Sequence, residues 1–203
     1  NTVLVQNGTL TGFNTDHVGF FHALKAKSIS ITGASAVVLG AGGAARAVIF
    51  SLMQHGVRRI SIHNRTVSRA KSLANDIKGM PQSLEVEIGE MTIAALKRKI
   101  ASCELLINTT SVGLWPEVDE APFLFDGPVR DLVAMDLIYN PLMTRFLSSA
   151  ESAGATSVDG LDMFIYQGLA SLKIWLNLDD DLSAYHAELR HFLLKELQKN
   201  GSN

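Results

Sequence analysis

Residues 37–46 read Val37-Val38-Leu39-Gly40-Ala41-Gly42-Gly43-Ala44-Ala45-Arg46. An apolar stretch runs into a glycine-rich turn, and helix-forming residues follow it. This order is typical of the first strand, turn and helix of a Rossmann domain, where glycines let the backbone approach a pyrophosphate. The amides and the dipole at the helix N-terminus attract the phosphates. We therefore predict a dinucleotide site at Gly40, Ala41, Gly42, Gly43 and Ala44, against the alternative of a purely structural turn.

The residues after the next expected strand indicate which dinucleotide binds. Rossmann domains usually carry an acidic residue there, about 20 residues past the glycines, for the ribose 2′-hydroxyl. Residues 59–63 lead instead into Asn64, Arg65 and Thr66, with Arg69 one turn later. Arginine suits a 2′-phosphate because its planar fork binds two oxygens at once. The cofactor is predicted to be NADP; the alternative is a solvated helix start with Thr66 as an ordinary cap.

Strand-like and helix-like segments alternate across the middle of the chain. This alternation predicts an α/β fold with a doubly wound parallel sheet, a Rossmann-type NADP-binding domain. We expect strands at 36–39, 59–63, 84–88, 105–108, 133–138 and 155–158, and helices at 44–55, 67–78, 91–101 and 142–153.

The two ends of the chain have a different pattern. The turn pair Asn7-Gly8 predicts a hairpin with strands at 2–6 and 10–13. A helix at 17–27 is expected to bury Phe20, Phe21 and Leu24. Helical patterns at 161–175 and 183–199 follow the last strand with no strand between them.

Composition excludes several classes of protein. Of the 203 residues, 47% are hydrophobic and 19% are charged, as in packed globular proteins. A net charge of −2 without a basic run predicts neither a nucleic-acid nor a membrane partner. The single cysteine, Cys103, is interpreted as structural and fits a reducing, cytoplasmic location. The six histidines show no metal-ligand spacing, so no metal is predicted.

A third polar loop begins where the strand at 105–108 ends. It reads Asn108-Thr109-Thr110-Ser111-Val112-Gly113. Ligands of open α/β sheets bind at the carboxyl ends of the strands, so we predict that Asn108 and Thr109 contact the cofactor, against the alternative of an ordinary polar loop. Taken alone, Asp16 is better explained by helix capping than by a functional role, and Tyr139 and Gln167 look ordinary.

Further motifs occur in a fixed order along the chain. Besides the glycine loop and the Asn64 and Asn108 segments, they are Asn1-Thr2, Gly12-Phe13-Asn14-Thr15-Asp16-His17-Val18-Gly19, Asp136-Leu137-Ile138-Tyr139-Asn140-Pro141 and Asp159-Gly160-Leu161-Asp162-Met163-Phe164-Ile165-Tyr166-Gln167. Together they resemble the shikimate dehydrogenase family, NADP-dependent oxidoreductases that reduce 3-dehydroshikimate to shikimate in aromatic amino acid biosynthesis. The resemblance runs from residue 1 to about residue 175.

The resemblance implies a role for each matching residue. Asp16 corresponds to the aspartate of a catalytic lysine–aspartate pair and also contacts the substrate. Asn1 corresponds to an asparagine that holds substrate hydroxyls, and Tyr139 and Gln167 to residues that line the substrate pocket. The positions of Leu137, Gly160 and Met163 correspond to the nicotinamide pocket. Hydride transfer to a ketone needs a proton donor within hydrogen-bond reach, and the lysine of the pair would supply it.

The resemblance also implies a division into domains. Residues 1–16 match a remnant of a substrate domain with its hinge, residues 17–160 the NADP-binding domain, and residues 161–203 helices that return towards the substrate domain. No lysine here matches the catalytic one, which the family carries on an N-terminal domain absent from these residues. We therefore expect this isolated chain to be inactive and to expose apolar surface on its last helices. A homodimer is a further possibility.

Two alternative functions stay open. A quinate/shikimate dehydrogenase is the enzymatic alternative, although Arg65 stands where those relatives tend to carry an acidic residue. A catalytically silent NADP-binding module is the alternative of another class. The presence of Asp16, Tyr139 and Gln167 argues against it, because a binding module does not need substrate-binding residues.

Overall fold

The computed structural model describes residues 1–77 and 84–200. The chain forms two compact units, one of residues Ser30–Gly160 and one of residues Asn1–Ile29 together with Leu161–Asn203. Helix α1 (Asp16–Ala26) belongs to the second unit, so this boundary differs from the one expected at residue 17. Gly19 of α1 lies close to the backbone of α6 (Gly160–Leu176) at Met163 and Gln167, which explains why the helix groups with that unit.

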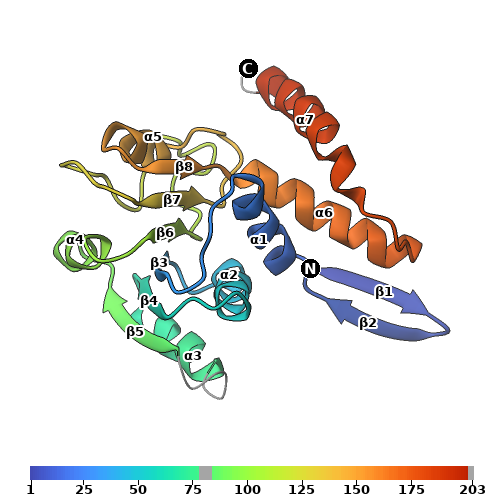
Figure 1. The fold of residues 1–203 in the computed structure, drawn as a ribbon, viewed down its shortest axis with the longest axis horizontal. Coiled ribbons are helices and arrows are strands. Elements are labelled where there is room, and N and C mark those ends of the chain that lie inside the picture. Colours follow the sequence, from blue (N-terminus) through green and yellow to red (C-terminus); the bar gives the residue numbers. More distant parts are fainter. Residues whose placement is uncertain (78–83, 201–203) are drawn as a thin grey trace. The chain divides into compact units, whose positions relative to one another are not determined.

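The first unit is built on a six-stranded parallel sheet (Figure 1). Its strands are β3 (Ser35–Leu39), β4 (Arg59–Asn64), β5 (Glu85–Glu90), β6 (Leu105–Asn108), β7 (Val133–Asp136) and β8 (Thr156–Val158). They lie in the order β5-β4-β3-β6-β7-β8, and every neighbouring pair is parallel. The order reverses between β3 and β6, which is the doubly wound Rossmann arrangement, and the predicted fold class is confirmed.

Helices cover both faces of this sheet. Figure 1 shows α2 (Gly43–Gln54) and α3 (Val67–Asp76) on one side and α4 (Ile93–Ile100) and α5 (Arg145–Ser152) on the other. The strands are apolar because both faces are buried, and all five residues of β3 have little exposed surface. One core cluster joins β3, β6 and β7 to α4 and α5 through side chains such as Leu106, Leu96 and Phe146.

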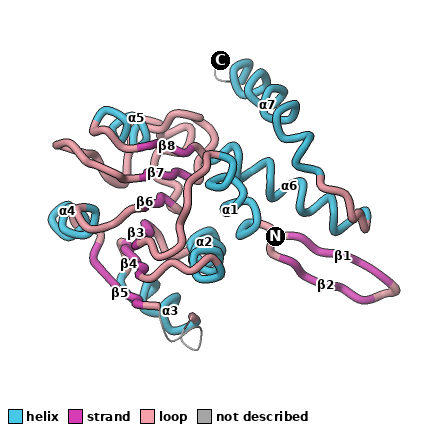
Figure 2. The backbone as a smooth tube through the Cα atoms, viewed as in Figure 1, coloured by secondary structure: helices cyan, strands magenta, loops and turns pink. Residues whose placement is uncertain are grey.

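Several element boundaries differ from the sequence-based expectation. Strand β7 ends at Asp136 rather than at residue 138, and α5 begins at Arg145 rather than at residue 142. The hydroxyl of Thr144 accepts a hydrogen bond from the amide of Leu147, so Thr144 caps this helix and sets its start. Lys78, expected to end the helix at 67–78, lies outside the described residues. A long loop, drawn in pink in Figure 2, joins β6 to β7.

The second unit combines a hairpin with helices. Strands β1 (Thr2–Gln6) and β2 (Thr9–Phe13) pair antiparallel, and Asn7 (φ 50°) and Gly8 (φ 76°) make the turn between them, as predicted. Helix α6 (Gly160–Leu176) is followed by a short 3-10 turn (Leu182–Tyr185) and α7 (His186–Asn200). Phe21 is only half-buried, which corrects the expectation that it belongs to the core of α1.

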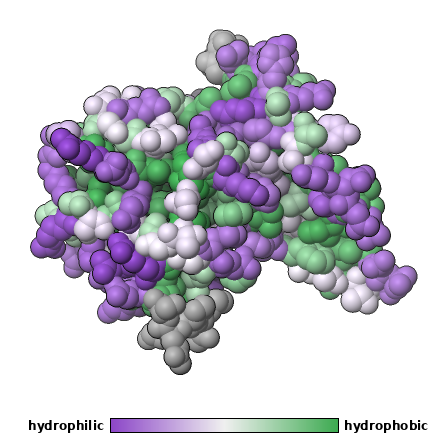
Figure 3. Space-filling view, in the orientation of Figure 1, coloured by the Kyte–Doolittle hydropathy of each residue, from purple (hydrophilic) through white to green (hydrophobic). Residues whose placement is uncertain are grey.

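A buried carboxylate anchors α7 to α6. Asp162 is 5% exposed, and its Oδ1 lies 2.9 Å from Nε2 of His186 and 2.7 Å from a guanidinium nitrogen of Arg190. Apolar side chains nevertheless reach the surface of this unit, as was expected, among them Leu176 and Phe192, which are about 60% exposed. Hydrophobic residues also lie over the hairpin in Figure 3. No helix in the described part of the chain is long and apolar enough to cross a membrane.

Candidate active site

The glycine turn places an open backbone at the N-terminus of α2. Gly40 has φ 111°, a left-handed conformation, and its amide donates to the carbonyl of His63 at 2.8 Å. A side chain at Gly42 or Gly43 would meet no atom within 4 Å, so both glycines border open space. The first amides of a helix have no partner within the helix. Open space beside these amides fits a pyrophosphate.

The predicted 2′-phosphate clamp lies at the carboxyl end of β4. The side-chain amide of Asn64 donates to the carbonyl of Thr66 at 2.8 Å and stiffens the turn into α3. Thr66 occupies the cap position without a capping hydrogen bond from its side chain. Arg65 and Arg69 are exposed, and neither guanidinium forms an ion pair within residues 1–77 and 84–200. Two guanidiniums of this kind are available to an anion.

A buried carboxylate organises the third loop. Asp136 at the end of β7 is fully buried, and its Oδ1 accepts from the Asn108 amide at 3.0 Å and from the backbone amide of Ile138 at 3.1 Å. Its Oδ2 accepts from the hydroxyl of Thr144 at 2.7 Å. Burial raises the pKa of this carboxyl to about 6, while the three hydrogen bonds act in the opposite direction. Sequence reasoning did not select Asp136 as a site residue; its signal was a lone charge ending an apolar strand.

The buried side chain of Asn108 stabilises this loop through hydrogen bonds. It is fully buried, and besides its bond to Asp136 its oxygen accepts from the backbone amide and the hydroxyl of Thr110. It therefore shapes the loop rather than presenting a surface to a ligand. Thr109 is partly exposed and donates its hydroxyl to the carbonyl of Leu39 at 2.7 Å.

Two residues expected near the nicotinamide lie side by side. The amide of Gly160 donates to the carbonyl of Ile138 at 3.2 Å, and a side chain at Gly160 would lie 2.3 Å from the carbonyl oxygen of Leu137. Only glycine permits this approach of two backbones. Tyr139, the residue after Ile138, is 37% exposed. Met163, the third residue expected there, is on α6 in the other unit and is 8% exposed.

The second unit brings together three of the four predicted substrate-binding residues. The side-chain amide of Asn1 donates to Oδ1 of Asp16 at 2.7 Å and lies 3.3 Å from Oε1 of Gln167. Asp16 begins α1 and Gln167 lies on α6, so residues from both ends of the chain meet. We call Asn1, Thr15, Asp16 and Gln167 the polar cluster. Thr15 was missed as a site residue, although its hydroxyl lies 2.8 Å from the Asn1 amide.

A glycine explains how α1 and α6 come close enough for this contact. A side chain at Gly19 would lie 2.5 Å from the carbonyl oxygen of Met163 and 2.9 Å from Cβ of Gln167. The absence of a side chain therefore lets the two backbones approach. Gly19 ends the Asn14-Thr15-Asp16-x-x-Gly motif, which gives this motif a structural meaning.

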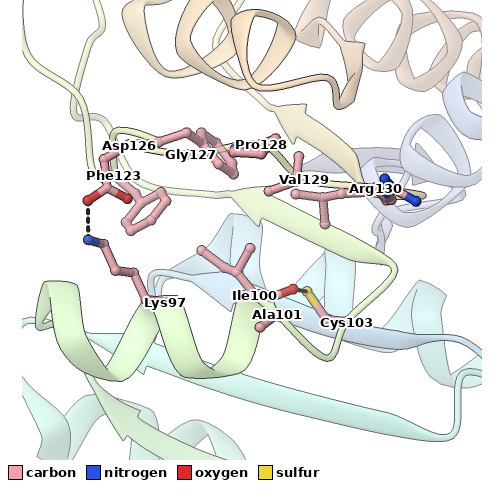
Figure 4. Close-up of a pocket in the computed structure, with 12 residues that line it drawn as sticks. Lys97, Ile100, Ala101, Cys103, Phe123, Asp126, Gly127, Pro128, Val129 and Arg130 are labelled. Carbon is pink, nitrogen blue, oxygen red and sulfur yellow. Dashed lines mark hydrogen bonds and ion pairs between the residues drawn. The ribbon is translucent and has the colours of Figure 1, made fainter.

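A separate cavity lies beside α4, in the first unit (Figure 4). Its volume is about 410 Å³, and Ile100, Phe123 and Leu132 line part of its wall. Lys97 and Asp126 form an ion pair at its edge. Burial raises the pKa of the Cys103 thiol to about 12, so this cysteine is no nucleophile at neutral pH. The described residues contain no group of three histidine, cysteine or acidic side chains that could hold a metal.

Comparison with known proteins identifies the family. The fold and the loops define a dinucleotide-binding α/β protein of the Rossmann type. A family model described as shikimate/quinate 5-dehydrogenase matches residues 23–114. The NADP(+)-dependent shikimate dehydrogenase of Haloarcula marismortui is 39% identical over 193 residues, which are 95% of this chain and 68% of that protein. The chain belongs to the shikimate dehydrogenase family.

Two further relatives support this assignment. The NADP(+)-dependent shikimate dehydrogenase of Moorella thermoacetica is 37% identical over 94% of this chain. The crystal structure of shikimate 5-dehydrogenase from Thermus thermophilus, in complex with NADP(H) and shikimate, superposes with a TM-score of 0.74 at 35% identity, covering 93% of this chain and 66% of that one. The chain spans 64% of the Moorella protein's length, so these 203 residues correspond to about two thirds of such relatives.

Proposed function

We propose that this chain carries the NADP site and part of the substrate site of an enzyme that interconverts 3-dehydroshikimate and shikimate. The observation that carries the proposal is the contact of Asn1 with both Asp16 and Gln167. A resemblance in sequence assigns all three to the substrate, and the fold brings them within hydrogen-bond distance. The names of the Haloarcula and Moorella relatives support both the substrate and the cofactor.

The reaction assigns a task to each group. When bound, NADPH supplies the hydride that reduces the ketone. Asp16 pairs with and orients the lysine that protonates the ketone oxygen, while Asn1 and Gln167 hold substrate hydroxyls and Tyr139 lines the pocket. No lysine in the described part of the chain forms an ion pair with Asp16. The proposal therefore includes a further segment of the same protein that contributes this lysine.

The cofactor is held by groups of this chain. The amides at residues 40–44 bind the pyrophosphate, and Arg65 and Arg69 bind the 2′-phosphate. Residues Thr109, Leu137, Gly160 and Met163 border the nicotinamide. A cytoplasmic location and a homodimer complete the proposal; the first is supported by the biosynthetic role and by a lone cysteine, the second by the family resemblance alone.

The decisive test measures NADPH formation by the full protein with shikimate and NADP, beside quinate and beside NAD. We expect shikimate and NADP to be the preferred pair. Asp16→Asn should lower turnover by roughly 10²- to 10⁴-fold, because the lysine loses its charged partner. NADP binding, measured by calorimetry, should stay within about twofold in this variant, which excludes general unfolding.

Each alternative predicts a different result. A preference for quinate would make the protein a quinate dehydrogenase. Tight NADP binding without turnover of either substrate, in the full protein, would identify a silent NADP-binding module. Near-normal turnover of Asp16→Asn would remove Asp16 from the catalytic role.

A further inference from the structure

The two amides of the polar cluster have defined orientations. The backbone amide of Thr15 donates to Oδ1 of Asn1 at 2.8 Å, so the nitrogen of the Asn1 side chain points the other way, to Thr15 Oγ1 and Asp16 Oδ1. The nitrogen of Gln167 donates to the carbonyl of Phe164 at 2.9 Å, so its oxygen faces Asn1 and Thr15. Turning either amide over would place donor against donor or acceptor against acceptor.

The hydroxyl of Thr15 lies between these amides. It accepts from Asn1 Nδ2 at 2.8 Å and donates to Gln167 Oε1 at 3.4 Å, and Ser171 Oγ lies 3.0 Å away. Asn1 Nδ2 has two protons, and its two short bonds, to Thr15 and Asp16, use both. The oxygen of Gln167 therefore takes the proton of Thr15 at 3.4 Å and can only share a proton of Asn1 Nδ2, which lies 3.3 Å away.

Burial makes this hydroxyl hard to replace. Thr15 is 2% exposed, and the neighbouring Thr2 and Ser171 are 2% and 5% exposed. Water has little access to a group in this position, so a lost hydroxyl leaves its partners unsatisfied. Only a side chain that both donates and accepts can bridge an amide nitrogen and an amide oxygen there, and serine is the one smaller residue that does so.

We propose that Thr15 is a positioning residue, whose hydroxyl fixes the side-chain amides of Asn1 and Gln167 in the orientation that recognises a polyhydroxylated substrate. The inference rests on the proposed function, because it assumes that these two amides bind the substrate. After the bonds above, the second proton of Gln167 Nε2 remains for a ligand, and the second lone pair of Asn1 Oδ1 has only a long contact, of 3.5 Å, with the hydroxyl of Thr2. These are a donor and an acceptor, which together match a hydroxyl group.

The test compares two substitutions at one position. Thr15→Val keeps the shape of the side chain and removes the hydroxyl, whereas Thr15→Ser keeps the hydroxyl. In the full protein saturated with NADP, Thr15→Val should weaken shikimate binding about tenfold or more, and Thr15→Ser should restore it to within about threefold. The KM for NADP should not change in either variant.

Thr2→Val is the matched control. Thr2 is as buried as Thr15, but its hydroxyl bonds Ser171 at 2.7 Å and has only long contacts with Thr15 Oγ1, at 3.4 Å, and Asn1 Oδ1, at 3.5 Å. Its loss should therefore affect shikimate binding much less. Equal losses in Thr2→Val and Thr15→Val would show that only the packing of the buried hydroxyls matters, and wild-type binding by a folded Thr15→Val would also overturn the proposal.

A second readout separates this inference from the proposed function. In the 203-residue chain, the side-chain amide NMR signals of Asn1 and Gln167 report orientation without any substrate. Thr15→Val should shift and broaden both, and Thr15→Ser should not. Unchanged signals in Thr15→Val would overturn the positioning role. If these signals respond but the full wild-type protein does not bind shikimate, the proposed function fails while the role of Thr15 in holding the amides stands.

Discussion

The glycine loop of the first unit presents its backbone, whereas the polar cluster of the second unit presents side chains. Gly42 and Gly43 border open space and offer amides at a helix start. Asn1 and Gln167 are 166 positions apart in the chain and meet through hydrogen bonds with Thr15 and with each other. A site made of backbone amides needs residues without side chains, so that a ligand can approach. A site made of side-chain amides needs hydrogen-bond partners that hold each amide in one orientation. The two regions should therefore fail under different substitutions.

The largest effect is expected where two backbones touch on the cofactor side. Gly160→Ala places Cβ 2.3 Å from the carbonyl oxygen of Leu137 and 2.7 Å from that of Ile138. Backbone atoms cannot turn aside as a flexible side chain can, so we expect a loss of about 4 kcal/mol in the free energy of unfolding. Urea unfolding followed by circular dichroism measures this loss.

The control for this variant is on the same helix. Gly168 also lies in α6, and a side chain there would meet no atom within 4 Å. Gly168→Ala should raise the free energy of unfolding by about 0.5–1 kcal/mol, because alanine favours the helix. Similar stabilities of the two variants would refute the importance of the contact between residues 137 and 160.

The parts of this comparison that sequence reasoning captured are local. The glycine turn, the parallel sheet and the position of Arg65 directly after β4 follow from short local patterns. The contact of Asn1 with Gln167 came only through family resemblance, because no local pattern links residues at the two ends of a chain. Helix α5 begins three residues late because the hydroxyl of Thr144 caps it, a bond that helical periodicity does not reveal.

The first unit also depends on one buried side chain. Asp136 holds the loops after β6 and β7 through hydrogen bonds with Asn108, Ile138 and Thr144. The folded state binds its proton more tightly than the unfolded state does, since burial raises the pKa from 3.8 to about 6. Its contribution to stability is therefore fully present below about pH 4 and is lost as the pH rises through about 6.

Comparison with a variant that cannot titrate isolates this effect. Relative to Asp136→Asn, the wild type should lose up to about 3 kcal/mol of unfolding free energy between about pH 4 and pH 7. Urea unfolding of both proteins at several pH values measures the difference, in which all other groups cancel. A difference that stays constant with pH would contradict the raised pKa.

An exposed carboxylate supplies the opposite control. The hydrogen bond from Lys97 lowers the pKa of Asp126. Its contribution is present above the unfolded pKa and is lost as the pH falls, so the difference between wild type and Asp126→Asn should change in the reverse direction. The effect should be small, because Asp126 is exposed.

The smallest effect on the fold, and a clear effect on binding, is expected at Arg65. This side chain is exposed, so Arg65→Ala should leave stability within about 0.5 kcal/mol of the wild type. The loss of a charged hydrogen-bond donor to the 2′-phosphate should weaken NADPH binding roughly 10- to 100-fold. NADH lacks this phosphate, so its affinity should not change.

The matched control is another exposed arginine of the same unit. Arg130 precedes β7, at the amino-terminal edge of the sheet, whereas Arg65 follows β4 at the carboxyl edge, where ligands of such sheets bind. Arg130→Ala should therefore bind NADPH and NADH like the wild type in a fluorescence titration. Equal weakening by the two variants would mean that net charge, rather than a clamp at the end of β4, attracts the cofactor. If only Arg65→Ala weakens NADPH binding while leaving NADH binding unchanged, the backbone amides of the glycine loop bind the pyrophosphate and the side chain of Arg65 selects NADPH over NADH.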